Sequence, residues 1–442
     1  MCSKPSIYHV VSLTGITLSM LFSASSVDAH GLHDVLHQVE HHAPQLHTAS
    51  ARADASDAGV RVIKSQYWGH AETFATTTHY NNKRLVNPIS YPQTLTASSF
   101  DQNTYGFGAA YTLPIDIDGR ITAQVHAQEQ LSQAAHQSAA QTRLSVFAQT
   151  VQLYRGLQRL EGIKQAHLAH LKALQDHQKV TQASVRVGRV AAVELLRIEA
   201  EIQSVEGLLA GVKGDEIRLR AALGALMNQA MFAEVVEPLK VQPETKDFLE
   251  HQDTWLKHRP DLLAAQSVNR AENENLKRAK DEWLPALSLR AETMHQKGYQ
   301  ANGATTWSVN AQLTWQVWDG GRRSANSDRA QANREVARQQ YQSTWNQAKA
   351  ELLSAEAGWQ AASEQYEAAT YGLKAATETE RIQSDRFHHG RISAVDLIDA
   401  EAALARARAD ETTALASWWL ADDQLYLAEG NAPSAYSKSG EQ

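Results

Sequence analysis

Two long stretches without proline constrain this chain more than any other feature. The ten prolines lie at positions 5, 44, 88, 92, 114, 238, 243, 260, 285 and 433. Residues 115–237 and 286–432 therefore contain none, and both stretches are rich in Ala, Gln, Glu, Leu and Arg. Because proline costs about 3 kcal/mol inside a helix, these stretches predict very long helices, half of either one making a rod approaching roughly 100 Å. The length of 442 residues would suit about three ordinary domains, but the pattern disfavours a compact multidomain enzyme.

Net charge and hydropathy exclude two classes of protein. The formal net charge is −7 and no long basic stripe is present, which argues against nucleic acid as a partner. The mean hydropathy is −0.43, and beyond the N-terminus no apolar run reaches the roughly 18 residues of a membrane-spanning helix. A helical transporter is excluded. Membrane-spanning β-strands are not, since they need only about ten alternating residues.

The N-terminus resembles an export signal. Lys4 precedes an apolar core over Val10–Phe22, and Val27-Asp28-Ala29 is a small-residue cleavage site. These features predict a signal peptide over residues 1–29, with a buried core helix as the alternative. The only cysteine, Cys2, lies ahead of the apolar core and would be lost with the signal. The mature chain would then have no disulfide, thiol nucleophile or cysteine metal site.

An internal repeat divides the chain. Residues 187–196 align with residues 389–398 at an offset of 202, and the same offset places Gly119-Arg120 on Gly321-Arg322. Nearer the start of each repeat the offset is 216, because the first half carries extra loop around Pro88 and Pro92. This repeat predicts a duplicated organisation: a first structural repeat over 30–236, a linker over 237–249, a second structural repeat over 250–430, and a flexible C-terminal tail over 431–442.

Each half shows the same order of patterns: a short helix, two alternating strands, a long helix, a glycine-centred turn and a long returning helix. The second strand of the first half has an apolar face of Tyr105, Phe107, Ala109, Tyr111, Leu113 and Ile115. At offset 202 that face recurs as Trp307, Val309, Ala311, Leu313, Trp315 and Val317. Such alternation is typical of a strand between lipid and a polar lumen. A strand of a soluble sandwich shows the same alternation, so the pattern alone leaves both open.

The long helices carry narrow apolar seams. In the first half the returning helix has its seam at Leu195, Ile198, Ile202, Val205, Leu209, Val212, Leu219, Leu223 and Leu226. The second half has a seam with smaller side chains, at Leu397, Ala400, Leu404 and Ala407. Spacing of three and four residues predicts coiled-coil packing, and two seams folded back at a glycine turn predict antiparallel hairpins.

Two junction motifs, together with the repeat, resemble those of TolC-like outer membrane efflux proteins. Trp283-Leu284-Pro285 leads into a strand, and Trp318-Asp319-Gly320-Gly321-Arg322-Arg323 lies at a strand-to-helix junction. The likeness covers nearly the whole mature chain. It implies a mainly α protomer with a β membrane portion, in which long coiled-coil hairpins accompany four β-strands. Four strands cannot close a barrel, because the smallest membrane barrels have about eight. In the family, homotrimers form a β-barrel of twelve strands that a helical α-barrel continues.

The resemblance also implies function and partners. Family members are passive exit ducts rather than enzymes, and they lie in the outer membrane in contact with its lipid. An inner-membrane pump supplies energy, and a periplasmic adaptor joins pump and duct. The junction residues expected to join strand and helix are Asp118, Gly119, Arg120, Asp319, Gly320, Gly321 and Arg322. The adaptor-contact tips would be Val187, Gly188, Arg189, Val190, His389, Gly390, Arg391 and Ile392. Plain helix-capping turns without a partner are the alternative for these tips.

A channel gate is the second implication. Asp396 and Asp399 match two family aspartates that narrow the periplasmic mouth, where three copies would form an electronegative ring that attracts cations. Glu194 and Arg197 occupy the equivalent positions of the first repeat and would hold the mouth shut through Arg391 or the aspartates. An ordinary solvated helix face is the alternative. Phe387 stands where a tyrosine is frequent in the family, which puts a hydroxyl-mediated link in doubt.

The histidines near the mature N-terminus offer a different function. His33, His37 and His41 are spaced i, i+4, i+8, as on one metal-binding helix face. We interpret them as a polar face on the outside and expect no metal site. His-Glu-x-x-His, phosphate-loop and nucleophile-elbow motifs are missing, so we expect no cofactor. A soluble periplasmic adaptor and a periplasmic metal-binding protein remain the rival functions. The sequence does not specify the cargo.

Overall fold

The computed structural model describes residues 31–88, 96–234, 236–240, 256–389 and 391–437. The predicted signal peptide, with Cys2, lies outside the described residues. So do residues 241–249 of the predicted linker, residues 438–442 of the predicted tail, and Gly390.

Four long helices confirm the prediction from the proline-free stretches. Helices α3 (Arg120–Arg186) and α7 (Arg322–His388) each have 67 residues, which corresponds to a length of about 100 Å. Helices α4 (Ala192–Leu226) and α8 (Ala394–Ala428) each have 35 residues and return along them. Within the described residues no helix has both the length and the apolar character needed to cross a membrane.

Shorter helices precede each pair of strands. The first half has two, α1 (Leu32–His42) and α2 (Pro44–Lys64), where the sequence predicted one. They separate at Pro44, which sits at the first position of α2, where its missing N–H is no loss. The second half has the single helix α6 (Pro260–Asp281), which also begins with proline.

The predicted C-terminal tail begins at residue 431, and the short helix α9 (Ser434–Ser437) lies within it. The ring of Tyr436 packs against His37 and Phe147, with centroids 5.0 and 5.2 Å away. Aromatic contacts of this kind stabilise the packing of α9 against α1 and α3. The flexibility of the tail stays a prediction.

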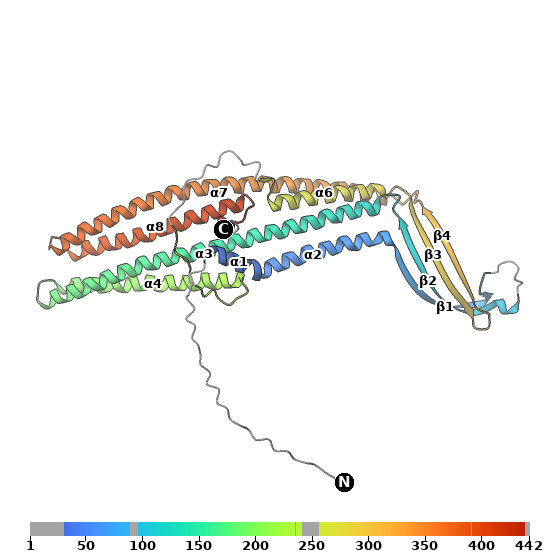
Figure 1. Ribbon diagram of the computed structural model, residues 1–442, viewed down its shortest axis with the longest axis horizontal. Coiled ribbons are helices and arrows are strands. Elements are labelled where there is room, and N and C mark those ends of the chain that lie inside the picture. The colour runs from blue at the N-terminus through green and yellow to red at the C-terminus, as the bar shows by residue number, and fades with distance from the viewer. Residues whose placement is uncertain (1–30, 89–95, 235, 241–255, 390, 438–442) are drawn as a thin grey trace, which may run out of the picture.

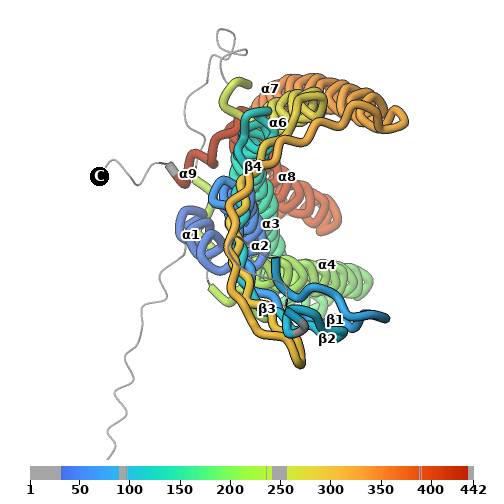
Figure 2. Tube along the Cα trace, turned by 90° about the vertical axis from the view of Figure 1, so that its right-hand side faces the viewer, coloured from blue at the N-terminus to red at the C-terminus, as the bar shows by residue number. Residues whose placement is uncertain are grey.

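The molecule is a rod with a sheet at one end and two hairpin turns at the other (Figure 1). Viewed down the long axis, its elements form a narrow, curved layer (Figure 2). Toward the sheet, α3 packs between α2 and α6, and α6 packs on α7. Toward the turns, α3 packs between α4 and α8, and α8 packs on α7. The layer therefore has α7 along one edge and α2 and α4 along the other.

The sheet is antiparallel in the order β1-β2-β3-β4. Its strands are β1 (His70–Leu85), β2 (Phe100–Ile115), β3 (Ala286–Gly298) and β4 (Ala304–Thr314). The prediction extended the last strand through Trp315 and Val317, which is wrong. Thr314 pairs with Ala286, the first residue of β3, so no neighbouring strand remains to pair with the residues beyond it.

The two faces of the sheet differ as the alternation predicted. One face carries Phe107 and Trp307, which are 66% and 79% exposed. The other face carries Thr, Asn and Gln together with a charged cluster. There the Arg290 guanidinium lies 3.1 Å from a Glu72 carboxylate oxygen and 3.0 Å from one of Glu292.

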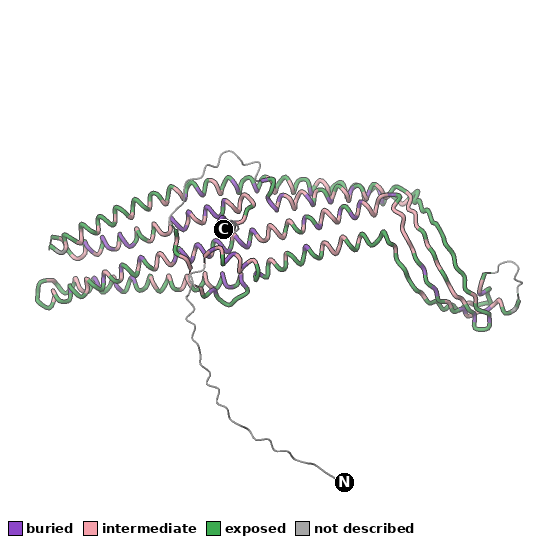
Figure 3. The backbone as a smooth tube through the Cα atoms, viewed as in Figure 1, coloured by how far each residue is buried: buried purple, intermediate pink, exposed green. Residues whose placement is uncertain are grey.

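Buried residues lie along the inside of the rod, mainly on α3 and α8, whereas α7 is largely exposed (Figure 3). The largest cluster joins α1, α3 and α4 around Phe147, Tyr154 and Leu223. A second joins α7 and α8 around Trp418. A third, of Leu174, Ile198, Ile202 and Val205, joins α3 and α4 toward the turns. The predicted seams are thus largely buried.

Candidate functional site at the hairpin tips and the inter-hairpin seam

The first hairpin reverses through a Schellman turn centred on Gly188. The Gly188 N–H donates to the Val185 carbonyl at 3.0 Å, and the Arg189 N–H donates to the Ser184 carbonyl at 2.9 Å. Gly188 has a φ of 72°, which glycine adopts without the strain that a Cβ would cause. Val187 is 68% exposed at this tip, and Arg189 is exposed. The turn thus presents an apolar and a basic side chain to solvent.

The second tip repeats part of this geometry. The Arg391 N–H donates to the Arg386 carbonyl at 2.9 Å, the same six-residue closure as at the first tip. His389 and Arg391 are exposed and Ile392 is half-buried, as is Val190 at the first tip.

The two aspartates of the predicted gate begin α8 on its exposed side. Asp396 forms a capping box with Ser393, whose hydroxyl and backbone N–H lie 2.8 and 3.1 Å from the same carboxylate oxygen. Hydrogen bonding from Ser393 holds the pKa of Asp396 below its usual value. The predicted rise of pKa by like-charge repulsion needs several copies around one axis and stays a prediction.

Glu194 and Arg197 interact with each other rather than across the hairpins. Their side chains approach to 3.6 Å within α4. Among the described residues of one protomer, no ion pair joins either of them to Arg391, Asp396 or Asp399. Their predicted role in holding the mouth shut therefore stays a prediction for an assembly of several copies.

The strand-to-helix junctions are built from aspartate–arginine pairs beside left-handed glycines. Asp118 accepts from the backbone and the side chain of Arg120. In the second half Asp319 pairs with Arg323 at 2.8 Å and with Arg322 at 3.8 Å. Arg322 also reaches Glu282 at 3.4 Å. Gly119, Gly320 and Gly321 have φ between 67° and 90°.

The seam between α3 and α8 contains polar contacts that the sequence did not predict. Arg155 donates to Asp423 at 2.9 Å, and the Asp423 side chain is fully buried. Closer to the tips, His177 Nε2 lies 2.5 Å from Glu401 Oε1. The partners come from different hairpins, 268 and 224 residues apart in the chain. A faint sequence signal exists, because His170 and His177 are one heptad apart beside the α3 seam.

The N-terminal histidines form a row on α1. The rings of His33 and His37 are 4.5 Å apart between centroids, and those of His37 and His41 are 6.3 Å apart. His33 Nδ1 lies 3.2 Å from the Ala435 carbonyl oxygen. In the part of the chain that the structure describes, no group of three or more His, Cys, Asp or Glu side chains is arranged to hold a metal ion.

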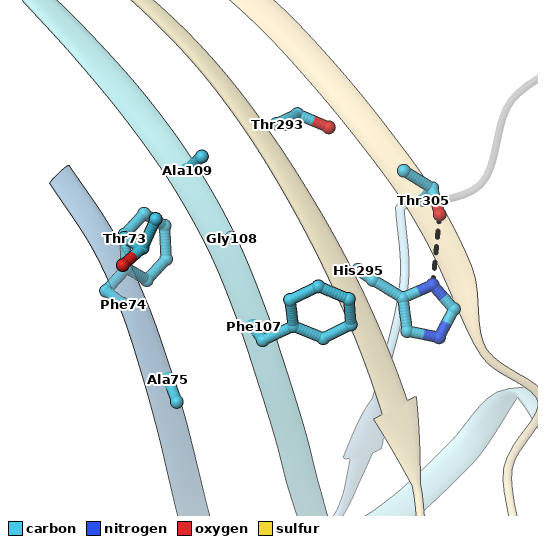
Figure 4. A pocket seen from close by; sticks show the side chains of 9 residues that line it. All are labelled: Thr73, Phe74, Ala75, Phe107, Gly108, Ala109, Thr293, His295 and Thr305. Atoms are coloured by element: carbon cyan, nitrogen blue, oxygen red, sulfur yellow. Dashed lines mark hydrogen bonds between the residues drawn. The ribbon is translucent and has the colours of Figure 1, made fainter. Parts of the chain in front are cut away.

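A hollow on the sheet, drawn in Figure 4, crosses all four strands. Small side chains such as Ala75, Ala109 and Thr293 leave space beside the ring of Phe107. His295 and Thr305 close its end through a 2.9 Å hydrogen bond. The hollow lies on the face that carries Phe107 and Trp307, and it holds no set of groups suited to catalysis.

These features define a class of protein. A four-stranded sheet continues into helices about 100 Å long, and the hairpins that these helices form end in exposed turns. Such an architecture is typical of a channel that crosses the cell envelope.

Comparison with known sequences places the chain within that class. The sequence profile of the outer membrane efflux protein family matches residues 35–229 and 253–431. The chain belongs to this family. It is an outer-membrane efflux channel of a Gram-negative envelope, and the rival reading as a soluble periplasmic adaptor is wrong.

Individual relatives are distant. The toluene efflux pump outer membrane protein TtgC of Pseudomonas putida is 22% identical over 368 residues, covering 80% of this chain and 74% of its own. The outer membrane protein OprJ of Pseudomonas aeruginosa is 24% identical over 332 residues, covering 70% and 67%. The crystal structure of VceC from Vibrio cholerae matches with a TM-score of 0.77 at 20% identity, covering 91% of this chain and 96% of that one. The likeness to VceC shows that the two chains have the same fold.

Proposed function

We propose that three copies of this chain close into one passive, non-enzymatic exit duct. The observation that carries the proposal is the pair of open edges. Strands β1 and β4 each have one paired side in the order β1-β2-β3-β4, and unpaired strand edges favour association. In the helical layer, α7 forms one edge and α2 with α4 forms the other. A single rotation that relates neighbouring copies would therefore pair β4 with β1 and α7 with α2 and α4. Three copies supply twelve strands, enough for a barrel that encloses a lumen.

The polar face of the sheet would then line the lumen and the face of Phe107 and Trp307 would meet lipid. Aromatic side chains at the sheet's junction with the helices support this orientation. Trp283, Trp315 and Trp318 are 50%, 64% and 84% exposed there. Tryptophan is enriched where a membrane protein meets the water interface.

The hairpin tips would contact a periplasmic adaptor that joins the duct to an inner-membrane pump. Each tip carries an exposed arginine, Arg189 or Arg391, directly after a glycine in the sequence. The same surface recurs twice per copy, so three copies present it six times around the tunnel end. We further propose that the two repeats, over 30–236 and 250–430, arose by duplication, since α3 matches α7 and α4 matches α8 in length. The signal over 1–29 would direct export.

Asp396 and Asp399 would narrow the periplasmic mouth. Both are exposed at the start of α8, beside the tip, and in three copies they would place six carboxylates around the axis. The ring would bind cations and let them block the current.

The test is electrical. Purified protein is reconstituted into planar bilayers, and block by a trivalent cation on the tip side is titrated. Asp396→Ala with Asp399→Ala should weaken the block by at least about tenfold, since two carboxylates per copy are lost. Asp410→Ala, which removes an exposed aspartate farther along α8, is the matched control. Unchanged block in the double variant would contradict the proposed ring of aspartates. A species other than a trimer in native mass spectrometry would contradict the proposed trimeric duct.

A further inference from the structure

The α3–α8 seam holds an ionisable cluster near the tips. His177 and Glu401 meet at 2.5 Å, and their side chains are 18% and 7% exposed. The second carboxylate oxygen of Glu401 is buried without a hydrogen-bond partner among the described residues. His170, one heptad away on α3, is 6% exposed, and its Nε2 is likewise buried and unpaired within the described chain. A buried carboxylate with incomplete hydrogen bonding depends strongly on the charge of its one partner.

Among the hydrogen bonds described between α3 and α8, this pair lies nearer the tips than Arg155–Asp423. It joins α3 of the first hairpin to α8 of the second, beside the buried Leu174 and the adjoining Ile398. The ring of Phe387, from α7, packs edge-on against His177 with centroids 5.9 Å apart. Any movement of the second hairpin away from the first must separate these side chains.

Charges from four helices act on the two histidines. The hydrogen bond to Glu401 raises the pKa of His177 above its ordinary 6.5, with Asp176 on α3 and Glu380 on α7 adding to the rise and burial opposing it. Burial lowers the pKa of His170, while Glu401 and Glu201, on α4, oppose that fall. Burial also lowers the pKa of His167. The packed seam therefore favours a proton on His177 and a neutral His170 and His167.

The two shifts act at opposite ends of the pH range. Stabilisation from His177 is complete below its ordinary pKa and is lost as pH rises through the raised value. Stabilisation from neutral His170 and His167 is complete above their ordinary pKa and is lost as pH falls through the lowered values. The seam is therefore most stable near neutral pH or slightly below it, and alkaline conditions remove the ion pair.

We propose that the His177–Glu401 pair is a proton-operated latch, which holds the second hairpin against the first while His177 is protonated and releases it as periplasmic pH rises. The control of conductance rests on the proposed function, because hairpin movement changes a lumen only in an assembled duct. The latch occurs only within a copy. At the offset of 202, His177 and Glu401 correspond to Thr379 on α7 and Glu199 on α4. The equivalent seam between α7 of one copy and α4 of the next would therefore lack a titrating imidazole.

The decisive measurement is the distance across the seam. Spin labels at Gln175 and Ala403, which are exposed on α3 and α8, are introduced as cysteines in the full-length protein. Pulsed electron resonance in detergent compares about pH 6.5 with about pH 9, a range that spans histidine titration. In the labelled parent the distance distribution should lengthen at the higher pH. The fraction in the separated form should rise by up to roughly tenfold per pH unit during titration.

Two uncharged variants test the cause. Glu401→Gln and His177→Gln each keep a hydrogen-bonding side chain but remove the titrating pair, so the pH-dependent lengthening should vanish in both. His136→Gln is the matched control, because His136 meets Asp57 at 3.1 Å on the exposed contact between α2 and α3. It should keep the parent's response.

A parent distance that does not change with pH overturns the latch, and so does a response that survives in both glutamine variants. Parallel bilayer recordings separate this result from the proposed function. A distance change in protein that conducts no current leaves the latch standing and contradicts the duct. If the protein conducts and neither the distance nor the current changes between the two pH values, the latch is contradicted and the proposed duct is still supported.

Discussion

At the scale of single residues, a glycine permits close contact between the two hairpins. Gly162 on α3 faces Thr412 on α8, and a Cβ added at Gly162 would overlap the Thr412 side chain. Thr412 is β-branched, so its rotamers offer little relief. Glycine inside a long helix is ordinarily unfavourable by roughly 0.5–1 kcal/mol relative to alanine, and here it permits the close approach.

The first prediction concerns this contact. Gly162→Ala should destabilise the protein by about 1–3 kcal/mol, the usual range for overpacking, because α3 and α8 must separate. Thermal unfolding in detergent measures it. Gly156→Ala on the same helix is the control, since the added Cβ would meet only the flexible end of Leu219 at 3.0 Å. Equal stability of the two variants would contradict the close seam.

At the scale of elements, the long helices and the strands follow from local patterns in the sequence. Proline positions bounded the helices, and alternation located β2 from Thr104 to its end at Ile115 but missed its start at Phe100. The end of β4 was missed because β4 ends where its partner β3 begins, at Ala286. The alternation within β4 carries no information about that position. The His177–Glu401 and Arg155–Asp423 pairs were missed for a related reason. Periodicity shows which face of a helix is buried, but not which distant helix covers it.

The tips illustrate how one local difference separates two equivalent elements. Ser393 caps α8 and hydrogen bonds to Asp396, whereas the equivalent position before α4 is Ala191, which offers no side-chain cap. The start of α8 is therefore held more firmly than the start of α4. The capped start is the one that carries Asp396 and Asp399, the proposed gate aspartates.

The second prediction tests the cap. Ser393→Ala should cost about 0.5–2 kcal/mol locally and speed amide exchange in the first turn of α8, measured by hydrogen–deuterium exchange. The pKa of Asp396 should rise toward its ordinary value, because its main hydrogen-bond donor is lost. The reciprocal change, Ala191→Ser, creates a capping box with Glu194 and should slow exchange at the start of α4. Unchanged exchange in both variants would show that the caps do not order the tips.

At the scale of the whole molecule, the two faces of the sheet assign an inside and an outside to the assembly. The Arg290 cluster lies on the polar face and combines one positive with two negative groups, Glu72 and Glu292. Each copy therefore contributes one net negative charge there. In the proposed trimer, three copies would repeat this charge around the lumen, far from Asp396 and Asp399 at the tips.

The last prediction follows from this orientation. Arg290→Gln leaves two glutamates unneutralised, so the reversal potential of a bilayer channel in a salt gradient should shift toward cation selectivity. The shift should shrink in concentrated salt, where screening is stronger. Glu72→Gln with Glu292→Gln should shift the potential in the opposite direction. Lys297→Gln, which removes one positive charge from the strand face that carries Phe107, is the matched control and should change little. Equal shifts from Arg290→Gln and Lys297→Gln would mean that the sheet does not enclose the lumen with its polar face.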